Sequence, residues 1–211
     1  DDYTIHAIRE LGTVYTHGVA IKPGKPVILG EIQGKPVIGL PGYPVSAYIT
    51  FLEFVVPLLD LYYERAGDSE HRVKARLTRT VMSGLKYEEY VQVKLGVVEG
   101  QMIAVPLSRG AGASMSLVKA DGFCVIPRNQ EGVLAHEEVE VRLTKNLEQI
   151  AKTLVVIGSH DLILDVLSDV LKEQRADAFL SSTHVGSLAG LMAIQKKEAH
   201  LAPTHLLEES E

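Results

Sequence analysis

The sequence predicts an α/β plus all-β protein with three successive regions. These are a partial α/β domain over residues 1–66, a small β-barrel domain over residues 70–145, and the start of a parallel α/β domain over residues 151–211. Apolar residues recur at helical spacing in the first region, alternate with polar residues in the second, and form short runs between helical stretches in the third. Polar breaks at residues 64–70 and 145–150 separate the regions and are expected to be linkers.

The amino-acid composition limits the classes of protein and of binding partner to be considered. The 211 residues are 46% hydrophobic and 23% charged, as in an ordinary globular protein. The single cysteine, Cys124, lies in an apolar run and is expected to be buried, which agrees with a reducing, cytoplasmic setting. A net charge of −6 gives no general attraction to nucleic acid. The run from Val45 to Leu61 is broken by polar residues, so we expect that no apolar stretch reaches the length needed to cross a bilayer.

The first region begins with a short predicted helix. One of the two leading aspartates is a good N-cap, and Gly12 ends the helix. Residues 13–21 alternate enough to form a strand, and residues 27–29 and 36–40 are rich in β-branched residues and too short for helices. This order of strands followed by a helix is an α/β pattern.

Two proline-glycine loops stand out in this region. The first, residues 22–26 (KPGKP), places Lys22 and Lys25 three residues apart. The second, residues 41–44 (PGYP), leads into a predicted helix from Pro44 to about residue 63, because proline suits the first helical position. Free N–H groups at a helix start favour an anion. The loops together predict an oxyanion or phosphate cradle; the alternative is ordinary turns with solvated lysines.

The second region is predicted to be all-β. Short alternating runs are separated by turns such as Glu99-Gly100 and Asp121-Gly122, a spacing typical of a small barrel or sandwich. The small-residue segment 109–116 (RGAGASMS) is expected to be a loop between two strands. The predicted strands cover residues 73–77, 90–95, 102–107, 123–126 and 139–143.

The third region reads strand, loop, helix, strand, loop, helix, with a third strand starting near residue 200. This order predicts a parallel sheet whose loops at the strand C-terminal ends bind a ligand. Ser159, Ser182 and Ser187 lie at these ends, where hydroxyl and N–H groups can hold an oxyanion. The alternative for Ser159 and Ser187 is a role as helix N-caps.

Other chemistries lack their sequence signatures. The eight histidines include no close pair at the i, i+4 spacing of a helical zinc site. Ser159, His160 and Asp161 are consecutive, so their side chains are not expected to converge as a catalytic triad, and the sequence has no G-x-S-x-G. A P-loop and a G-x-G-x-x-G are also missing from the sequence.

The segments DDYT, AIKPGKP and GLPGYPVSA resemble the second half of the catalytic domain of molybdopterin molybdenumtransferases, the MoeA/gephyrin family. The similarity extends in weaker form through about residue 145. It implies insertion of molybdate into adenylylated molybdopterin with release of AMP, assisted by Mg2+, in a homodimer. The family's glycine-glycine-x-serine loop has no counterpart here, so the chain is expected to be part of a longer protein.

The resemblance also implies site residues. Asp2, Lys22 and Lys25 would be catalytic, with Asp2 near the nucleotide or its metal ion. Ala111 and Gln92 depart from the family pattern, which uses serine and arginine, so oxyanion contacts from the barrel are expected to be weaker. Residues implied to bind the substrate are Pro26, Pro41, Gly42, Pro44, Ser46, Arg109 and Ser116.

The third region resembles the periplasmic-binding-protein-like domain found behind some molybdenumtransferases, through the segments GSHD and SSTHVGSLAGLM. This adds a second hypothesis: a module that binds molybdate, tungstate or a pterin without catalysis, with Ser159, Ser182 and Ser187 as a second ligand site. A scaffold without activity is a third. The distinguishing feature is whether oxyanion affinity depends on Lys22 and Lys25 or on these serines.

Overall fold

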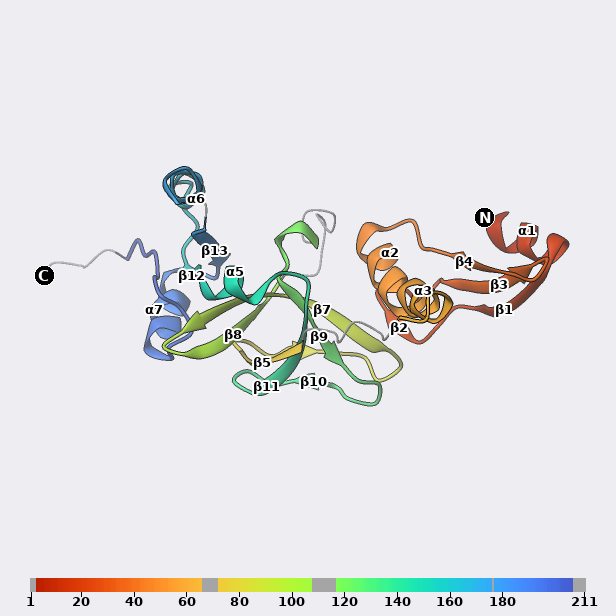
Figure 1. Ribbon diagram of the computed structural model, residues 1–211. Coiled ribbons are helices and arrows are strands. Elements are labelled where there is room, and N and C mark those ends of the chain that lie inside the picture. Colours follow the sequence, from red (N-terminus) through yellow and green to blue (C-terminus); the bar gives the residue numbers. More distant parts are fainter. Residues whose placement is uncertain (1–2, 66–71, 108–116, 176, 207–211) are drawn as a thin grey trace, which may run out of the picture.

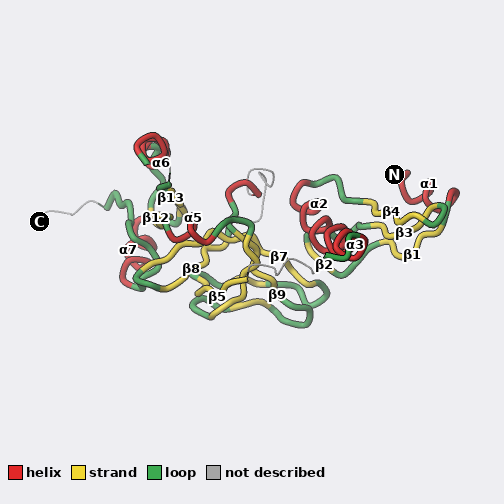
Figure 2. The backbone as a smooth tube through the Cα atoms, in the orientation of Figure 1, coloured by secondary structure: helices red, strands yellow, loops and turns green. Residues whose placement is uncertain are grey.

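The computed structural model describes residues 3–65, 72–107, 117–175 and 177–206. The N-terminal region lies at one end of an elongated arrangement, the β-barrel occupies the middle, and the C-terminal region packs on the far side of the barrel (Figure 1). The mixture of helices and sheets predicted from the sequence is confirmed, as the secondary-structure colouring makes clear (Figure 2).

The N-terminal region contains a small antiparallel sheet. Helix α1 (Tyr3–Leu11) covers strands β1 (Thr13–His17), β3 (Ile28–Ile32) and β4 (Lys35–Gly39), in the order β1-β3-β4. The helix buries Ile5 and Ile8 against Ile28. Strands β3 and β4 form a hairpin whose turn residues Gln33 and Gly34 both have positive φ, as a two-residue type I′ turn requires. The helix predicted here is present, and β3 and β4 overlap the runs predicted at residues 27–29 and 36–40. The strand predicted over residues 13–21 is interrupted, because β1 ends at His17, Gly18 has φ of +93°, and Ile21 and Lys22 pair with the barrel instead.

A continuous helical segment follows, as predicted from Pro44. It consists of α2 (Pro44–Thr50), a π-helical turn η1 (Phe51–Val55) and α3 (Val56–Tyr62). Its 19 residues and mean hydropathy of 1.5 make it long and apolar enough to cross a membrane, by length and composition only. The expectation that no stretch reaches that length was therefore wrong, because the few polar residues do not lower the average enough.

This helical segment rests on the barrel. Val45 and Ile49 pack against Tyr90 and Phe123, and the ring of Tyr48 stacks on Phe123 with centroids 5.9 Å apart. Farther along the segment, Glu53 forms an ion pair with Arg142 of the barrel. The N-terminal region is thus joined to the barrel by both apolar packing and charge.

The barrel is closed by five strands. Their order is β7 (Glu88–Val98), β8 (Gln101–Pro106), β5 (Arg72–Leu77), β11 (Glu138–Leu143) and β9 (Gly122–Ile126), and β9 pairs back to β7. A short pair, β6 (Val81–Met82) and β10 (Gly132–Val133), flanks it. Strand β2 (Ile21–Lys22) adds in parallel to β7. The barrel predicted from alternating residues is therefore confirmed.

Residues 145–150 are structured, contrary to the expectation of a linker. Lys145 Nζ lies 2.6 Å from a carboxylate oxygen of the buried Asp121, whose other oxygen accepts from the Leu95 N–H. The Asn146 side chain caps α5 (Leu147–Ala151), and Ile150 is buried in the barrel core. Because the segment is mostly polar, its sequence did not indicate that Ile150 would be buried.

The C-terminal region has the predicted strand and helix order. Strands β12 (Thr153–Gly158) and β13 (Phe179–His184) are parallel, and helices α6 (Ile163–Gln174) and α7 (Ser187–Gln195) follow them. The third strand predicted near residue 200 is represented by a single parallel bridge from Leu201 to Val156. Strand β13 runs two residues farther than the sequence predicted.

An apolar cluster joins the barrel to the C-terminal region. The barrel contributes Val98, Ile103 and Val105, and the C-terminal region contributes four residues from β12, α7 and the segment after α7. Lys197 Nζ also lies 2.7 Å from Glu99 across this contact. The members from the C-terminal region are Val155, Ile157, Ala193 and Ala199.

Gly96 permits the close approach of the two regions. A Cβ atom at this position would lie 2.2 Å from Cγ2 of the buried Val155. We expect Gly96→Ala to lower the free energy of unfolding by about 1–3 kcal/mol, because overpacking forces stiff side chains off their rotamers. Thermal unfolding measures this. Gly84→Ala, where a Cβ meets nothing within 4 Å, is the control, and equal effects of the two substitutions would contradict the prediction.

Cys124 lies in the barrel core, as the sequence predicted, and burial raises the pKa of its thiol to about 11. At pH 8 only about 0.1% of this thiol is ionised, and the thiolate is the reactive form. We therefore expect negligible reaction with Ellman's reagent in the native protein and one thiol per chain in guanidinium. Rapid reaction of the native protein would refute this assignment.

Candidate anion-binding site

Strand β2 places Lys22 beside the barrel. Ile21 and Lys22 pair in parallel with Glu88 and Glu89 of β7. The Lys22 side chain is 58% exposed, and its Nζ lies 3.6 Å from Oε1 of Glu89, whose side chain is 5% exposed. The ammonium group is therefore held at the barrel surface while it still faces solvent.

Glu89 is the main neighbour of Lys22. Its second carboxylate oxygen accepts a hydrogen bond of 2.8 Å from Ser83 Oγ, so the carboxylate is fixed in position. A buried carboxylate is stabilised by a facing cation and a hydrogen bond. Glu89 orients Lys22, but it also offsets part of the positive charge that the lysine presents to an anion.

The loop after β2 is held by its backbone. The Val19 N–H donates to the Lys25 carbonyl at 2.9 Å, and the Gly18 N–H donates to the Val27 carbonyl at 2.8 Å. Gly24 has φ of +120°, and a Cβ there would lie 2.8 Å from the side chain of Ile21. This position therefore requires glycine both for its backbone conformation and for space.

Lys25 projects from this loop over an aromatic ring. Its Nζ lies 5.7 Å from the ring centroid of Tyr87, which is the geometry of a cation–π contact. Pro26, next along the chain, is exposed. Lys22 and Lys25 are thus both positioned by residues of the barrel, one by a carboxylate and one by a ring.

The second loop stands at the start of α2. Pro44 is the first helical residue, Tyr43 precedes it in an extended conformation without a side-chain cap, and a Cβ on Gly42 would meet nothing within 4 Å. The first loop, in contrast, reaches Thr50, because a Gly24 Cβ would lie 3.1 Å from its Oγ1. Thr50 ends α2, about 9 Å along the axis from Pro44. A cradle shared by both loops stays a prediction.

The remaining implied residues of this site differ in how they are placed. Pro41 is the first residue of the second loop, and Ser46 lies half-buried in the first turn of α2. Asp2, Arg109 and Ser116 lie outside the described residues. In residues 3–65, 72–107, 117–175 and 177–206, no group of three or more His, Cys, Asp or Glu side chains could hold a metal ion. The Mg2+ site implied by the resemblance stays a prediction, because Asp2, the residue expected beside the ion, is not among the described residues.

Two of the three candidate serines of the C-terminal region lie in contact with each other, and the third does not. Ser159, after β12, and Ser187, at the start of α7, are both buried, with their Oγ atoms 2.6 Å apart. The His205 N–H donates to Ser187 Oγ at 3.1 Å. Ser182 lies farther back on β13, opposite Val156. The two hydroxyls therefore bind each other at the strand ends where the sequence predicted a ligand.

Several neighbours of these sites had no sequence signal. Glu89 and Tyr87 lie next to the two lysines because β2 pairs in parallel with β7, and residue spacing in the sequence does not predict this pairing. The rings of His160 and His184 lie with centroids 4.3 Å apart. Desolvation and the nearby His160 lower the pKa of His184. The adjacency of this pair arises from parallel strand ends and not from sequence spacing.

Two family descriptions match the first two regions. Residues 1–61 match "Probable molybdopterin binding domain", and residues 74–144 match "MoeA C-terminal region (domain IV)". A third match, "PBP superfamily domain", covers residues 168–211. The closed barrel coincides with the second of these matches.

Relatives of the chain include named molybdenum cofactor proteins. A molybdopterin biosynthesis protein of Methanocaldococcus jannaschii is 38% identical over 68% of this chain and 33% of its own length. The molybdopterin molybdenumtransferase of Haemophilus influenzae is 29% identical over 66% of this chain and 35% of its own length. This chain therefore spans about one third of the length of the curated relatives that it matches.

A solved structure agrees with these matches. The molybdopterin biosynthesis MoeA protein from Pyrococcus horikoshii superposes with a TM-score of 0.58 at 45% identity, covering 68% of this chain and 35% of that chain. A molybdenum cofactor biosynthesis protein from Pyrococcus furiosus gives 0.52 at 31% identity, covering 66% of this chain and 52% of that chain. The chain is therefore MoeA-like over its first two thirds, followed by a region that matches the PBP superfamily domain.

Proposed function

We propose that the protein carrying this chain acts in molybdenum cofactor biosynthesis, inserting molybdate into adenylylated molybdopterin with release of AMP. The observation that carries the proposal is the pairing of β2 with β7. It sets Lys22, from the region matching the molybdopterin-binding domain, against Glu89 of the region matching domain IV. A site built from both regions suits a reaction that joins two substrates.

The two lysines would offset the repulsion between the two anionic substrates of this reaction. Molybdate and the pterin phosphate are both anions, and they repel each other at short range. Cations fixed beforehand by Glu89 and Tyr87 offset this repulsion without reorganising during the reaction. Lys22 and Lys25 therefore bind and orient the oxyanion, and the exposed start of α2 offers N–H groups to a phosphate.

The test is an assay of the purified protein with adenylylated molybdopterin and molybdate. The proposal predicts AMP release that requires molybdate and yields cofactor able to reconstitute an apo molybdoenzyme. Binding of both substrates without AMP release would overturn catalysis and leave a binding function. Mg2+ is part of the proposal, and a chelator is expected to slow the reaction.

The proposal includes a cytoplasmic homodimer without a nucleic-acid or membrane partner. A net charge of −6 argues against nucleic acid. Val45, Ile49 and Glu53 of the apolar helical segment contact the barrel, which argues against insertion of that segment into a bilayer. Exposed Leu61 and Tyr62 at its end offer apolar surface to a second copy.

A second function is favoured by one observation in the C-terminal region. Ser159 and Ser187 place two hydroxyls at the ends of parallel strands, inside or next to the part matching the PBP superfamily domain. Such a site would capture molybdate, tungstate or a pterin and supply it to the first region. Binding that survives loss of Lys22 and Lys25 but not of Ser187 would support it.

A further inference from the structure

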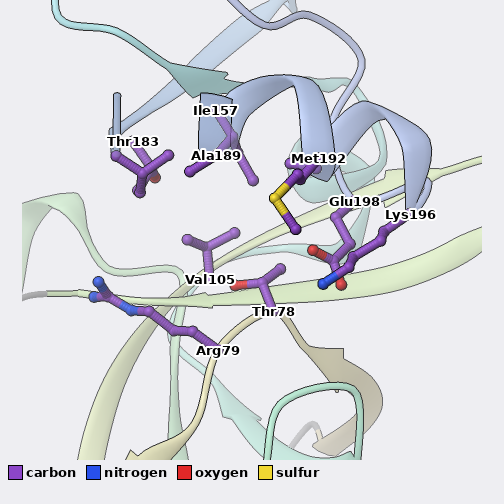
Figure 3. A pocket seen from close by; sticks show the side chains of 11 residues that line it. Thr78, Arg79, Val105, Ile157, Thr183, Ala189, Met192, Lys196 and Glu198 are labelled. Atoms are coloured by element: carbon purple, nitrogen blue, oxygen red, sulfur yellow. The ribbon is translucent and has the colours of Figure 1, made fainter. Parts of the chain in front are cut away.

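A groove of about 200 Å³ lies between the barrel and the C-terminal region (Figure 3). Thr78, Arg79 and Val105 line it from the barrel. Thr183 lines it from the end of β13, and Met192 lines it from α7. It is distinct from the Lys22 loop, which contacts the barrel through β2 and β7. The groove exists because the apolar cluster around Ile103 holds the two regions together.

The body of the groove is apolar. Val105 and Ile157 form part of the buried cluster beneath it, and Met192 and Ala189 line it from α7. Met192 is 45% exposed, so part of the apolar surface of the groove is open to solvent. A flat or compact apolar group would remove this surface from water at about 25 cal/mol per Å².

The charges at one end of the groove balance each other. The buried Glu198 carboxylate lies 2.7 Å from Nδ1 of His136, and Lys196 Nζ lies 3.3 Å from the other ring nitrogen. The Glu198 and His136 atoms are not aligned as a hydrogen bond, so their attraction is electrostatic. A carboxylate and an ammonium thus flank one imidazole, and this end has little net charge to offer a ligand.

Arg79 at the other end carries an uncompensated charge. Its guanidinium donates to the Pro106 carbonyl, and among the described residues no carboxylate forms an ion pair with it. The residue is exposed as a whole, yet partial desolvation of the guanidinium lowers its pKa. A guanidinium bonded to one neutral carbonyl retains donors in a fork that matches a carboxylate, phosphate or sulfonate. Figure 3 shows Thr78 between Arg79 and the end of the groove formed by Lys196 and Glu198, with Thr183 on the opposite wall from Arg79.

We propose that this groove is a binding site for a small organic anion with an apolar body, whose anionic group pairs with Arg79 and whose body lies against Val105 and Met192. The site is completed only when the barrel and the C-terminal region are joined, because Arg79 comes from one and Met192 from the other. Val185, in the loop that leads to Ser187, also lines the groove, so an occupant would contact this loop as well. The proposal is independent of the molybdate-transfer reaction.

The test is a titration of the full protein, labelled with ¹³C at the methionine methyls, with phenyl phosphate. We expect the Met192 methyl resonance to shift with saturation, while Met82, an exposed residue on β6, stays unchanged. Inorganic phosphate lacks the apolar body and phenol lacks the charge, so each is expected to bind at least tenfold more weakly. A Met192 resonance that does not move, or equal affinity for phosphate alone, would overturn the proposal.

Two variants test which residues of the groove contact the bound anion. Arg79→Gln is expected to raise the dissociation constant at least tenfold, whereas Arg76→Gln, a matched change on β5 of a side chain that bonds Gln101, leaves it unchanged. Ala189→Glu adds a carboxylate from an exposed helical position and is expected to abolish binding while the protein stays folded. Unaltered affinity in Arg79→Gln or in Ala189→Glu would show adventitious apolar binding instead.

Discussion

Replacement of Lys22 and Lys25 together by alanine is expected to reduce the rate of molybdate-dependent AMP release about 100-fold or more. Each lysine would contribute a charge-assisted contact to the oxyanion worth about 1.5 kcal/mol or more. Two such contacts, lost together, amount to about 3 kcal/mol, and each 1.4 kcal/mol is a factor of ten. The measurement is AMP release under single-turnover conditions, at saturating adenylylated molybdopterin.

The controls separate charge at the site from folding. Lys35→Ala removes an exposed lysine from β4 and is expected to leave the rate unchanged. Lys22→Ala removes a cation that faces the buried Glu89, so stability falls as well. In Lys22→Ala combined with Glu89→Gln, stability is expected to recover while activity does not. Recovery of activity in this double variant would show that Lys22 is structural.

Phe123→Ala is expected to lower the free energy of unfolding by about 3–5 kcal/mol, the range for removal of a buried aromatic side chain. Phe123 is fully buried on β9, where it packs against Val45 and Ile49 and stacks on Tyr48. The substitution therefore opens a cavity between the barrel and the helical segment. Chemical denaturation monitored by circular dichroism measures the loss.

The matched control is Tyr3→Ala, which truncates an aromatic residue that is 79% exposed at the start of α1. Its effect is expected to stay within about 0.5 kcal/mol. Hydrogen exchange adds a spatial readout, because residues 44–62 are expected to lose protection in Phe123→Ala before the barrel core does. A loss of less than 1 kcal/mol in Phe123→Ala would contradict the role of this contact.

The elements of the fold followed from local signals. The alternation around residues 73–77 and 139–143 predicted β5 and β11, since side chains of a barrel strand point alternately into the core and into solvent. Pro44 marked the start of the long helix for a stereochemical reason. Residues 145–150 were predicted to be a linker because the segment is mostly polar, but Ile150 anchors it in the barrel core, whereas Leu147 stays exposed.

The surroundings of the candidate site required tertiary structure. Lys22 and Lys25 were identified by their spacing, but their neighbours Glu89 and Tyr87 lie more than sixty residues away in the chain. The groove around Arg79 depends on how β12 docks beside Gly96, a contact with no local signature. The resemblance to MoeA, carried by the two proline-glycine loops, agrees with the comparisons over residues 1–61 and 74–144.

The most direct test of the proposed function is equilibrium binding of molybdate and tungstate to the full protein, with metal quantified in the protein fraction and adenylylated molybdopterin present. The account predicts stoichiometric binding that is lost in Lys22→Ala/Lys25→Ala and retained in Ser187→Ala. Binding that survives the loss of both lysines and disappears with Ser187 would contradict it, and would place the oxyanion in the C-terminal region.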